Sequence, residues 1–350
     1  MLNLTFRQLE LKKRHPLTIS RGTTISTINL FVLVSDGTHT GIGEMCPADA
    51  NGWTAEAGEA QLSACRAAGL SASPYLAWEA MNEAGVHPPA MAALEVALWD
   101  LLAKQAGLPL YRLLGLPKEQ VETSVTVGLN PPEVTRERTR EILEETRAKC
   151  LKIKIGSPNG TDYDQAHFLA AAEAAKPYRP KLRVDANGGW DVPTARMMLK
   201  WLAERGVDYV EQPLALGAEE DLPAIFEGRP VPIFVDETIK FAPDVLKVAG
   251  CVDGINLKLM KCGGICEAMR IVATARAHGL KTMIGCMSES SVSIAAGAAM
   301  GALFDHIDLD SQLGLDPDPA EGGARLVDGR IVPNDVPGHG ASLSEVRDAE

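Results

Sequence analysis

The sequence has few aromatic and few basic residues for its length, and both shortages exclude classes of protein. Phe, Trp and Tyr make up 5% of the 350 residues, apolar residues 46% and charged residues 23%, which is an ordinary globular balance rather than a disordered or fibrous one. Lys and Arg number 34 against 46 Asp and Glu, so the formal net charge is −12. Such a chain repels phosphate backbones and anionic lipid, and we expect it to bind neither nucleic acid nor a membrane surface.

Long apolar runs and cysteines are also scarce. The longest apolar run, SVSIAAGAAMGALF, is shorter than the roughly twenty residues that a membrane span requires, so we interpret it as a buried helix. The seven cysteines form an odd set, and the start MLNLTFRQLELKKRH lacks the apolar core of a signal peptide. We therefore expect a reducing, cytoplasmic location. Cys262 and Cys266 are four residues apart with Cys251 upstream, but the sequence has no second closely spaced pair that would complete a zinc site. We therefore take these cysteines as structural.

The length predicts more than one structural unit, because single cores stop growing near roughly 250 to 300 residues. In the first hundred or so residues, the alternating stretch STINLFVLVSDG followed by THTGIGEM predicts an antiparallel hairpin. The stretch PPAMAALEVALWDLLAKQAG opens with prolines and has apolar residues at helical spacing, which predicts a helix ending near Gly107. This part is an α+β unit.

From about residue 123 the pattern changes to eight short apolar runs: SVTVGL, CLKIKIG, KLRVDAN, DYVEQP, PIFVDE, GINLKL, KTMIGCM and HIDLD. Stretches of helical character separate them, which predicts a parallel (β/α) barrel. Functional groups of such a barrel gather at the C-terminal ends of its strands. Taken singly, the end of each run could equally be an ordinary turn, a strand stop or the solvated face of an edge strand. Together they favour one site formed by Lys152, Lys154, Asp185, Glu211, Asp236, Lys258, Asp308 and Asp310.

The residue types at these ends point to metal-assisted proton transfer. Asp185, Glu211 and Asp236 offer hard oxygen ligands on successive strands, which favours Mg²⁺, with Mn²⁺ as the alternative. Such an ion can take a substrate carboxylate and stabilise the charge that forms when the neighbouring carbon loses its proton. Lys154 and Lys258 would face each other across that carbon, an arrangement suited to inversion of a stereocentre. We expect Lys152 and the metal to discourage Lys154 from holding its proton.

Asp308 and Asp310 raise a separate question. On a strand both carboxylates point to the same side, and like charges held that close require a cation. A solvated acidic turn is the alternative interpretation.

The ordered set LKIKIG, RVDANGGW, VEQPL, VDET, INLKLMKCGG and GCMSES resembles the enolase superfamily, muconate-lactonizing subgroup, and within it the dipeptide epimerases. The resemblance covers nearly the whole chain, including PLTISRG, GIGEMCP, ALEVALWDL and the late DLD. It implies a (β/α)7β TIM-like barrel over residues 121–315 and an α+β capping domain over 1–120, completed by 316–350. The implied reaction is a Mg²⁺-dependent 1,1-proton transfer by two lysines at the α-carbon of the C-terminal residue of a dipeptide, through a metal-stabilised enediolate. The expected dipeptide is L-Ala-D/L-Glu.

The resemblance also implies a role for each residue. Asp185, Glu211 and Asp236 hold the metal, Lys154 and Lys258 exchange protons, and Lys152 contacts the metal-bound carboxylate. Asp308 and Asp310 bind the free α-ammonium of the substrate, which supplies the missing cation.

Residues that set specificity follow from the same resemblance. The cap segments 15–24 and 47–53, the latter with Trp53, are the expected specificity loops. Arg21 either binds an acidic substrate side chain or is an ordinary surface arginine. Cys286, Met287 and Ser288 should line the pocket, as should Glu289, which does not obviously favour a glutamate side chain.

Several alternatives remain open. An N-acyl amino acid racemase or an o-succinylbenzoate synthase would use the same lysines and metal, but neither needs the two aspartates. A Schiff-base aldolase and a non-catalytic barrel that acts as a binding protein are the remaining readings. We expect a small dipeptide as ligand and a homo-oligomer as assembly. Towards the C-terminus, GGARLVDGRIV predicts a hairpin, and the tail after Gly338 is expected to be loose.

Overall fold

The computed structural model describes residues 2–47, 51–69 and 71–344. The N-terminal part has a three-stranded antiparallel sheet with the order β1-β2-β3, formed by β1 (Asn3–Ile19), β2 (Gly22–Ser35) and β3 (Thr40–Met45). The helices α1 (Ala55–Ala67), α2 (Pro74–Glu83), α3 (Pro88–Gln105) and α4 (Leu110–Leu113) follow. The predicted hairpin is β2 and β3, and the predicted helix is α3, which is followed by Gly107 at φ +66°. Both predictions are confirmed.

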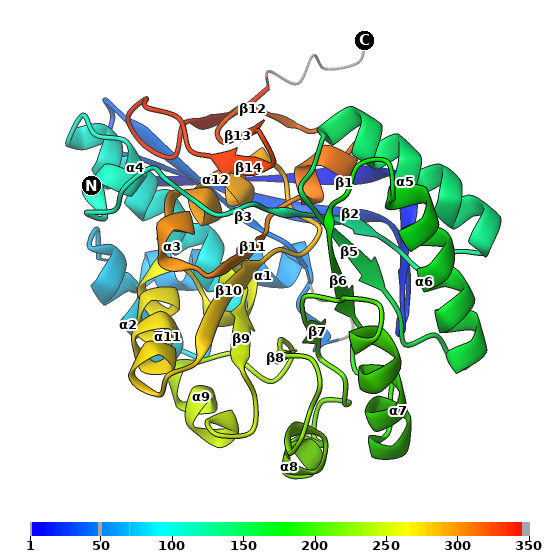
Figure 1. The fold of residues 1–350 in the computed structure, drawn as a ribbon. Coiled ribbons are helices and arrows are strands. Elements are labelled where there is room, and N and C mark those ends of the chain that lie inside the picture. The colour runs from blue at the N-terminus through cyan, green and yellow to red at the C-terminus, as the bar shows by residue number, and fades with distance from the viewer. Residues whose placement is uncertain (1, 48–50, 70, 345–350) are drawn as a thin grey trace.

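Eight parallel strands form the barrel, and each pairs with the next one along the chain (Figure 1). They are β4 (Ser124–Val127), β5 (Cys150–Lys154), β6 (Lys181–Asp185), β7 (Val210–Glu211), β8 (Ile233–Val235), β9 (Gly254–Leu257), β10 (Lys281–Gly285) and β11 (His306–Asp308). A bridge between Thr123 and Ile307 joins the last strand to the first. The eight predicted apolar runs are these strands, because a strand covered on both faces must be apolar along its length.

Helices cover the outside of the strands. They are α5 (Pro132–Thr146), α6 (Thr161–Ala175), α7 (Val192–Ala203), α8 (Leu222–Phe226), α9 (Ala242–Val248), α11 (Ile265–Ala277) and α12 (Ser291–Ala299), with the additional short α10 (Leu259–Cys262) and the 3₁₀ turns η2 (Glu219–Asp221), η3 (Gly301–Leu303) and η4 (Ser311–Gly314). The (β/α)7β architecture is therefore confirmed. α12 is buried from Val292 to Ala299, as predicted for the longest apolar run. No helix in the described ranges has both the length and the hydropathy that a membrane crossing needs.

The C-terminal segment returns to the first sheet. It contains β12 (Ala320–Gly322), β13 (Arg325–Val327), β14 (Arg330–Val332) and β15 (Ala341–Leu343). The predicted hairpin is β13 and β14, with Asp328 and Gly329 in the left-handed conformation that its tight turn requires. The expected loose tail after Gly338 is wrong up to residue 344, because β15 pairs with β12 and buries Ala341 in an apolar cluster with Leu11 and Phe31. Residues 345–350 lie outside the described ones, and the division at 120 and 315 stays a prediction.

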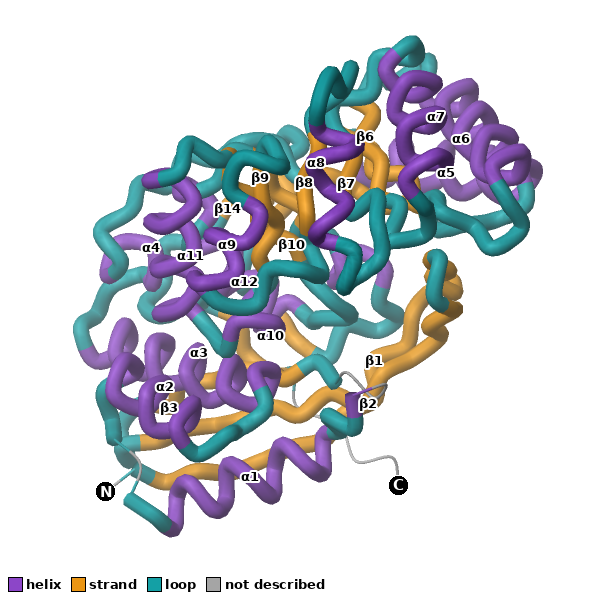
Figure 2. Tube along the Cα trace, turned by 90° about the horizontal axis from the view of Figure 1, so that it is seen from below, coloured by secondary structure: helices purple, strands orange, loops and turns teal. Residues whose placement is uncertain are grey.

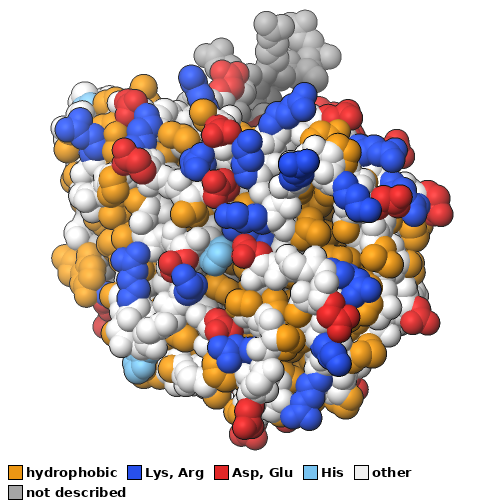
Figure 3. Space-filling view, in the orientation of Figure 1, with side chains coloured by type: hydrophobic (Ala, Val, Ile, Leu, Met, Phe, Trp, Pro, Cys, Tyr) orange, Lys and Arg blue, Asp and Glu red, His pale blue; other side chains and the backbone are white. Residues whose placement is uncertain are grey.

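Two buried glutamates attach the first 105 residues to the barrel. Glu44 of β3 accepts hydrogen bonds from the backbone N–H and the hydroxyl of Ser290, directly before α12. Glu95 of α3 accepts from the backbone N–H groups of Ile265 and Cys266, the first turn of α11. Helix N-termini present unpaired N–H groups and a partial positive charge, so both carboxylates cap a barrel helix from outside. Figure 2 shows α1, α2, β1 and β2 gathered on one side of the barrel. On the face in Figure 3, basic and acidic side chains are interspersed.

Candidate active site

The predicted functional side chains lie together at the C-terminal end of the barrel. Parallel pairing places Lys154, the last residue of β5, beside Asp185, the last of β6, and Asp185 beside Glu211, the last of β7. Asp236 follows β8 and Lys258 follows β9. Each of the three carboxylate residues is at most 1% exposed. The strand register therefore brings the acids and the lysines to one place, as the barrel pattern requires.

Each buried carboxylate is turned onto a lysine ammonium. Lys154 Nζ lies 2.6 Å from Asp185 Oδ2, and Lys258 Nζ lies 2.9 Å from Asp236 Oδ2. Lys261, which sequence reasoning missed, also binds the Asp236 carboxylate. The nearest charged partner of Lys154 is thus Asp185 rather than Lys152. Among residues 2–47, 51–69 and 71–344, no three acidic, histidine or cysteine side chains converge as a ready metal cluster.

The donor chemistry nevertheless fits a hard cation. Burial raises the pKa of Glu211 to about 7, and the charge of Asp185 acts in the same direction. Burial alone would raise the pKa values of Asp185 and Asp236. The ammonium of Lys154 nevertheless holds the pKa of Asp185 below its usual value, and Lys258 does the same for Asp236. Three buried carboxylates at successive strand ends thus depend on positive charge. Oxygen ligands of this kind suit Mg²⁺ or Mn²⁺.

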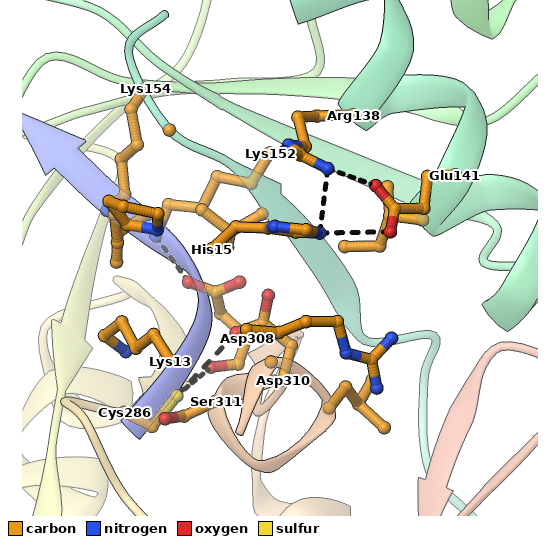
Figure 4. Close-up of a pocket in the computed structure, with 18 of the residues that line it drawn as sticks. Lys13, His15, Arg138, Glu141, Lys152, Lys154, Cys286, Asp308, Asp310 and Ser311 are labelled. Atoms are coloured by element: carbon orange, nitrogen blue, oxygen red, sulfur yellow. Dashed lines mark hydrogen bonds and ion pairs between the residues drawn. The ribbon is translucent and has the colours of Figure 1, made fainter. Parts of the chain in front are cut away.

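Lys152 supplies part of the cation that the aspartate pair requires. Its Nζ lies 2.5 Å from Asp308 Oδ2 (Figure 4). It also lies 2.7 Å from Glu211 Oε2, and the lysine is 1% exposed. Burial disfavours the charge, yet Asp308 and Glu211 raise the pKa of Lys152 well above its usual value. The expectation that the cation comes only with the ligand is therefore wrong for Asp308. The pairing joins β5 to β11, which are separated by β4 in the barrel, and no local pattern in the sequence indicates it.

Asp310 differs from Asp308. It forms no ion pair within the part of the chain that the structure describes, and burial together with the charge of Asp308 raises its pKa to about 6. The second oxygen of Asp308, Oδ1, is buried and lacks a hydrogen-bond partner there. These acceptors provide a place for one further cation.

Lys154 and Lys258 line the same cavity as Asp308 and Asp310. Its volume is about 290 Å³. The two lysines come from β5 and from the end of β9, which lie on opposite sides of the eight-stranded barrel. A carbon atom between them is thus accessible from two faces.

The segment after β10 contributes only part of what was expected. Cys286 and Met287 line the cavity, and the thiol of Cys286 donates to the carbonyl of Asp308 at 3.3 Å. Ser288 and Glu289 are not among the residues that line these two cavities, and their place in the pocket stays a prediction. The carbonyl of Ser288 accepts from Asn29 of β2, and the carboxylate of Glu289 turns back onto the N–H of Met287. Burial raises the pKa of Glu289 to about 8.

A second cavity, of about 660 Å³, lies beside the ends of β6, β7 and β8. Its apolar wall includes Pro47, Trp53, Leu216 and Met260, and residues 48–50 of the expected loop 47–53 lie outside the described residues. Arg21 also lines it. The guanidinium is already engaged, because it lies 2.7 Å from Glu237 Oε1 and donates to the carbonyl of Asn187 at 2.7 Å.

Comparison with known protein families gives two matches along the chain. Residues 3–115 match the family "Mandelate racemase / muconate lactonizing enzyme, N-terminal domain", and residues 134–347 match "Enolase C-terminal domain-like".

Individual relatives align over almost the whole length. A protein of Roseobacter litoralis named "Hydrophobic dipeptide epimerase" is 57% identical over 344 residues, which cover 98% of this chain and 99% of that protein. A protein of a Flavobacteria bacterium with the same name is 52% identical over 346 residues, with the same two shares. The crystal structure of a dipeptide epimerase from Enterococcus faecalis, complexed with Mg and L-Leu-L-Tyr, has a TM-score of 0.89 at 32% identity and covers 97% of this chain and 98% of that one.

Proposed function

Because the chain belongs to the mandelate racemase and muconate lactonizing enzyme family of the enolase superfamily, we propose that it is a Mg²⁺-dependent epimerase of dipeptides. The reaction is the inversion of the α-carbon of the C-terminal residue. The observation that carries the proposal is the pair of lysines, Lys154 and Lys258, on opposite sides of one cavity that also contains two aspartates.

The side chains divide the work. Asp185, Glu211 and Asp236 would hold the magnesium ion, which would supply a positive charge that stabilises negative charge on the substrate carboxylate. One lysine removes the α-proton, and the lysine on the far side returns a proton to the opposite face, so that the configuration inverts. The direction of the reaction decides which lysine acts first.

The aspartates orient the other end of the substrate. Asp310 and the free oxygen of Asp308 accept from the α-ammonium group, so the N-terminal residue lies toward β11. An N-acylated amino acid carries no such cation and would leave a buried negative charge uncompensated. This contrast disfavours an N-acyl amino acid racemase and an o-succinylbenzoate synthase.

The substrate class that we propose is a dipeptide with uncharged side chains rather than L-Ala-D/L-Glu. Arg21, the expected partner of a glutamate side chain, is paired with Glu237. The second cavity presents Pro47, Trp53 and Leu216 to the side chain of the C-terminal residue. The relatives at 57% and 52% identity carry a matching name.

The test is α-proton exchange in D₂O with Mg²⁺, followed by mass spectrometry and by a chiral assay of the product. We expect L-Ala-L-Leu to incorporate deuterium and to epimerise. Lys154→Ala and Lys258→Ala each abolish epimerisation, while the remaining lysine still exchanges the proton of the one epimer whose α-hydrogen it faces. Lys200→Ala, an exposed lysine of α7, is the control and keeps full activity. Near-normal epimerisation by either active-site variant would refute the two-base scheme.

We further propose that the enzyme acts in the reducing cytoplasm as a homo-oligomer. All seven cysteines are free, and burial raises the pKa of the pocket thiol of Cys286 well above its usual value, which keeps that thiol protonated and unreactive.

A further inference from the structure

The cavity that contains the catalytic lysines extends past the aspartate pair into a space between β1 and α5. Four aliphatic side chains line this outer part: Leu17 of β1, Val134 and Ile142 of α5, and Leu313 of η4. All four are only partly buried. Partly buried aliphatic groups around a hollow lose water when an apolar group enters, so the wall favours an apolar occupant.

The walls of this outer part are built from regular elements. Val134, Arg138, Glu141 and Ile142 occupy one face of α5, because they are spaced by one helical turn or two. Opposite them, the pairing of β1 with β2 breaks between Lys12 and Leu17, and beyond the break Leu129 N–H donates to the Thr18 carbonyl at 2.8 Å. The end of β1 is therefore attached to the barrel, and the width of the space is fixed.

The charged side chains of the outer wall neutralise one another. Arg14 lies 2.8 Å from Glu145. Glu141 lies 2.7 Å from Arg138 and 3.0 Å from His15 (Figure 4). No carboxylate of this group is left over for a cationic side chain. Lys13 also lines the cavity and has no ion-pair partner in the described ranges. Its positive charge would repel a cationic substrate side chain.

Resting on the proposed function, we infer that this outer space is the subsite for the side chain of the N-terminal residue of the dipeptide, and that it takes an uncharged aliphatic group. The α-ammonium is held at Asp310 and Asp308, which line the same cavity. The side chain of the N-terminal residue, on the carbon that carries the ammonium group, can then extend along Leu17, Ile142 and Leu313. The second cavity, beyond the lysines, serves the C-terminal residue instead.

The test compares L-Leu-L-Ala with L-Ala-L-Ala in variants that fill the space. Ile142→Trp and Val134→Trp each lower kcat/KM for L-Leu-L-Ala by about tenfold or more, the scale on which a pocket discriminates a methylene group. The same variants change kcat/KM for L-Ala-L-Ala by less than about threefold, a result that also shows that they fold. Leu169→Trp, on the exposed side of α6, is the matched control and changes neither value.

Three further comparisons separate the subsite from a general effect on activity. Leu216→Trp, in the second cavity, lowers kcat/KM for L-Ala-L-Leu more than for L-Leu-L-Ala. Where a tryptophan variant does not fold, Ile142→Ala enlarges the space and raises the preference for L-Phe-L-Ala over L-Ala-L-Ala by several fold. The wild-type enzyme prefers L-Leu-L-Ala to L-Lys-L-Ala and to L-Glu-L-Ala.

The outcomes separate the two proposals. Equal losses for both substrates in the α5 variants, or an equal rate with L-Lys-L-Ala and L-Leu-L-Ala, overturn the subsite alone. Absence of exchange with every dipeptide in the wild-type enzyme overturns the proposed function itself.

Discussion

Replacing Asp310 by asparagine should stabilise the protein and weaken its activity at the same time. Asp310 lies near Asp308, and burial with this second charge raises its pKa from 3.8 to about 6. A raised pKa in the folded state means that ionising Asp310 costs folding free energy. The cost is absent below about pH 4, grows between pH 4 and 6, and is fully present above pH 6. The Asp310→Asn variant avoids this cost while keeping the shape of the side chain.

The size of the gain follows from the difference in pKa. A pKa of about 6 in place of 3.8 corresponds to about 3 kcal/mol at 1.36 kcal/mol for each pKa unit. Asp310 is partly exposed and interacts with Asp308, so solvent screening reduces this figure, and we expect about 1 to 2 kcal/mol at pH 8. The loss of a hydrogen bond to a charged group costs about 1.5 to 3 kcal/mol, so kcat/KM for a dipeptide should fall about tenfold to a hundredfold.

The assay is urea unfolding of the wild type and of Asp310→Asn at pH 8 and pH 5, with kcat/KM for L-Ala-L-Leu measured across the same range. The stability gain at pH 8 should shrink by about half at pH 5, since the wild-type carboxyl is then largely protonated in the folded state. Wild-type kcat/KM should fall below pH 6 through this group, and the variant should lack that limb. Asp221→Asn, an exposed aspartate, is the control. A variant that is destabilised at pH 8, or that binds dipeptides as well as the wild type, would refute the reasoning.

Three further predictions concern the metal, the cap and the specificity loop. Removing divalent metal with EDTA should abolish α-proton exchange and lower the melting temperature, and Mg²⁺ should restore both, because a ligand of the folded state stabilises it; unchanged exchange in EDTA would exclude the metal. Glu95→Ala leaves the buried N–H groups of Ile265 and Cys266 without acceptors and should lower the free energy of unfolding by about 3 kcal/mol, with a smaller loss for Glu95→Gln, as measured by urea unfolding. Arg21→Ala should change kcat/KM for L-Ala-L-Glu and L-Ala-L-Leu by similar small factors, since an exposed ion pair such as the one with Glu237 contributes about 0 to 1 kcal/mol; a selective loss for L-Ala-L-Glu would show that Arg21 binds the acidic side chain.

Features that depend on short-range patterns could be predicted from the sequence. The barrel strands are apolar along their length, and their parallel pairing fixes that Lys154, Asp185 and Glu211 meet at one end. Helix α3 announces itself by its prolines and by its apolar spacing. In each case the signal, strand burial or helical spacing, acts within a few neighbouring residues, and the structure shows the element that it predicts.

Features that depend on partners far apart in the chain could not be predicted from the sequence. Lys152 and Asp308 are 156 positions apart, and nothing near Lys152 indicates that it turns toward β11. Arg21 could be placed in a specificity loop, but its engagement by Glu237 requires the exact approach of the cap to the barrel. Cys286 and Met287 line the cavity, whereas the backbone carbonyl of the next residue, Ser288, accepts a hydrogen bond from Asn29 of β2, and the sequence does not indicate this contact. Such pairings follow from packing between units.

The structure also separates two aspartates that the sequence presents as equivalent. Lys152 joins Asp308 to Glu211 and so connects one member of the pair to the end of β7. In the described part of the chain, no lysine or arginine does the same for Asp310. Under the proposed function, an arriving ammonium group meets a single uncompensated charge, and its binding offsets the burial and the repulsion from Asp308 that together raise the pKa of Asp310. An acylated amine leaves that repulsion in place. We therefore propose that selection for a free N-terminus depends on Asp310, the aspartate that has no ion-pair partner among the described residues.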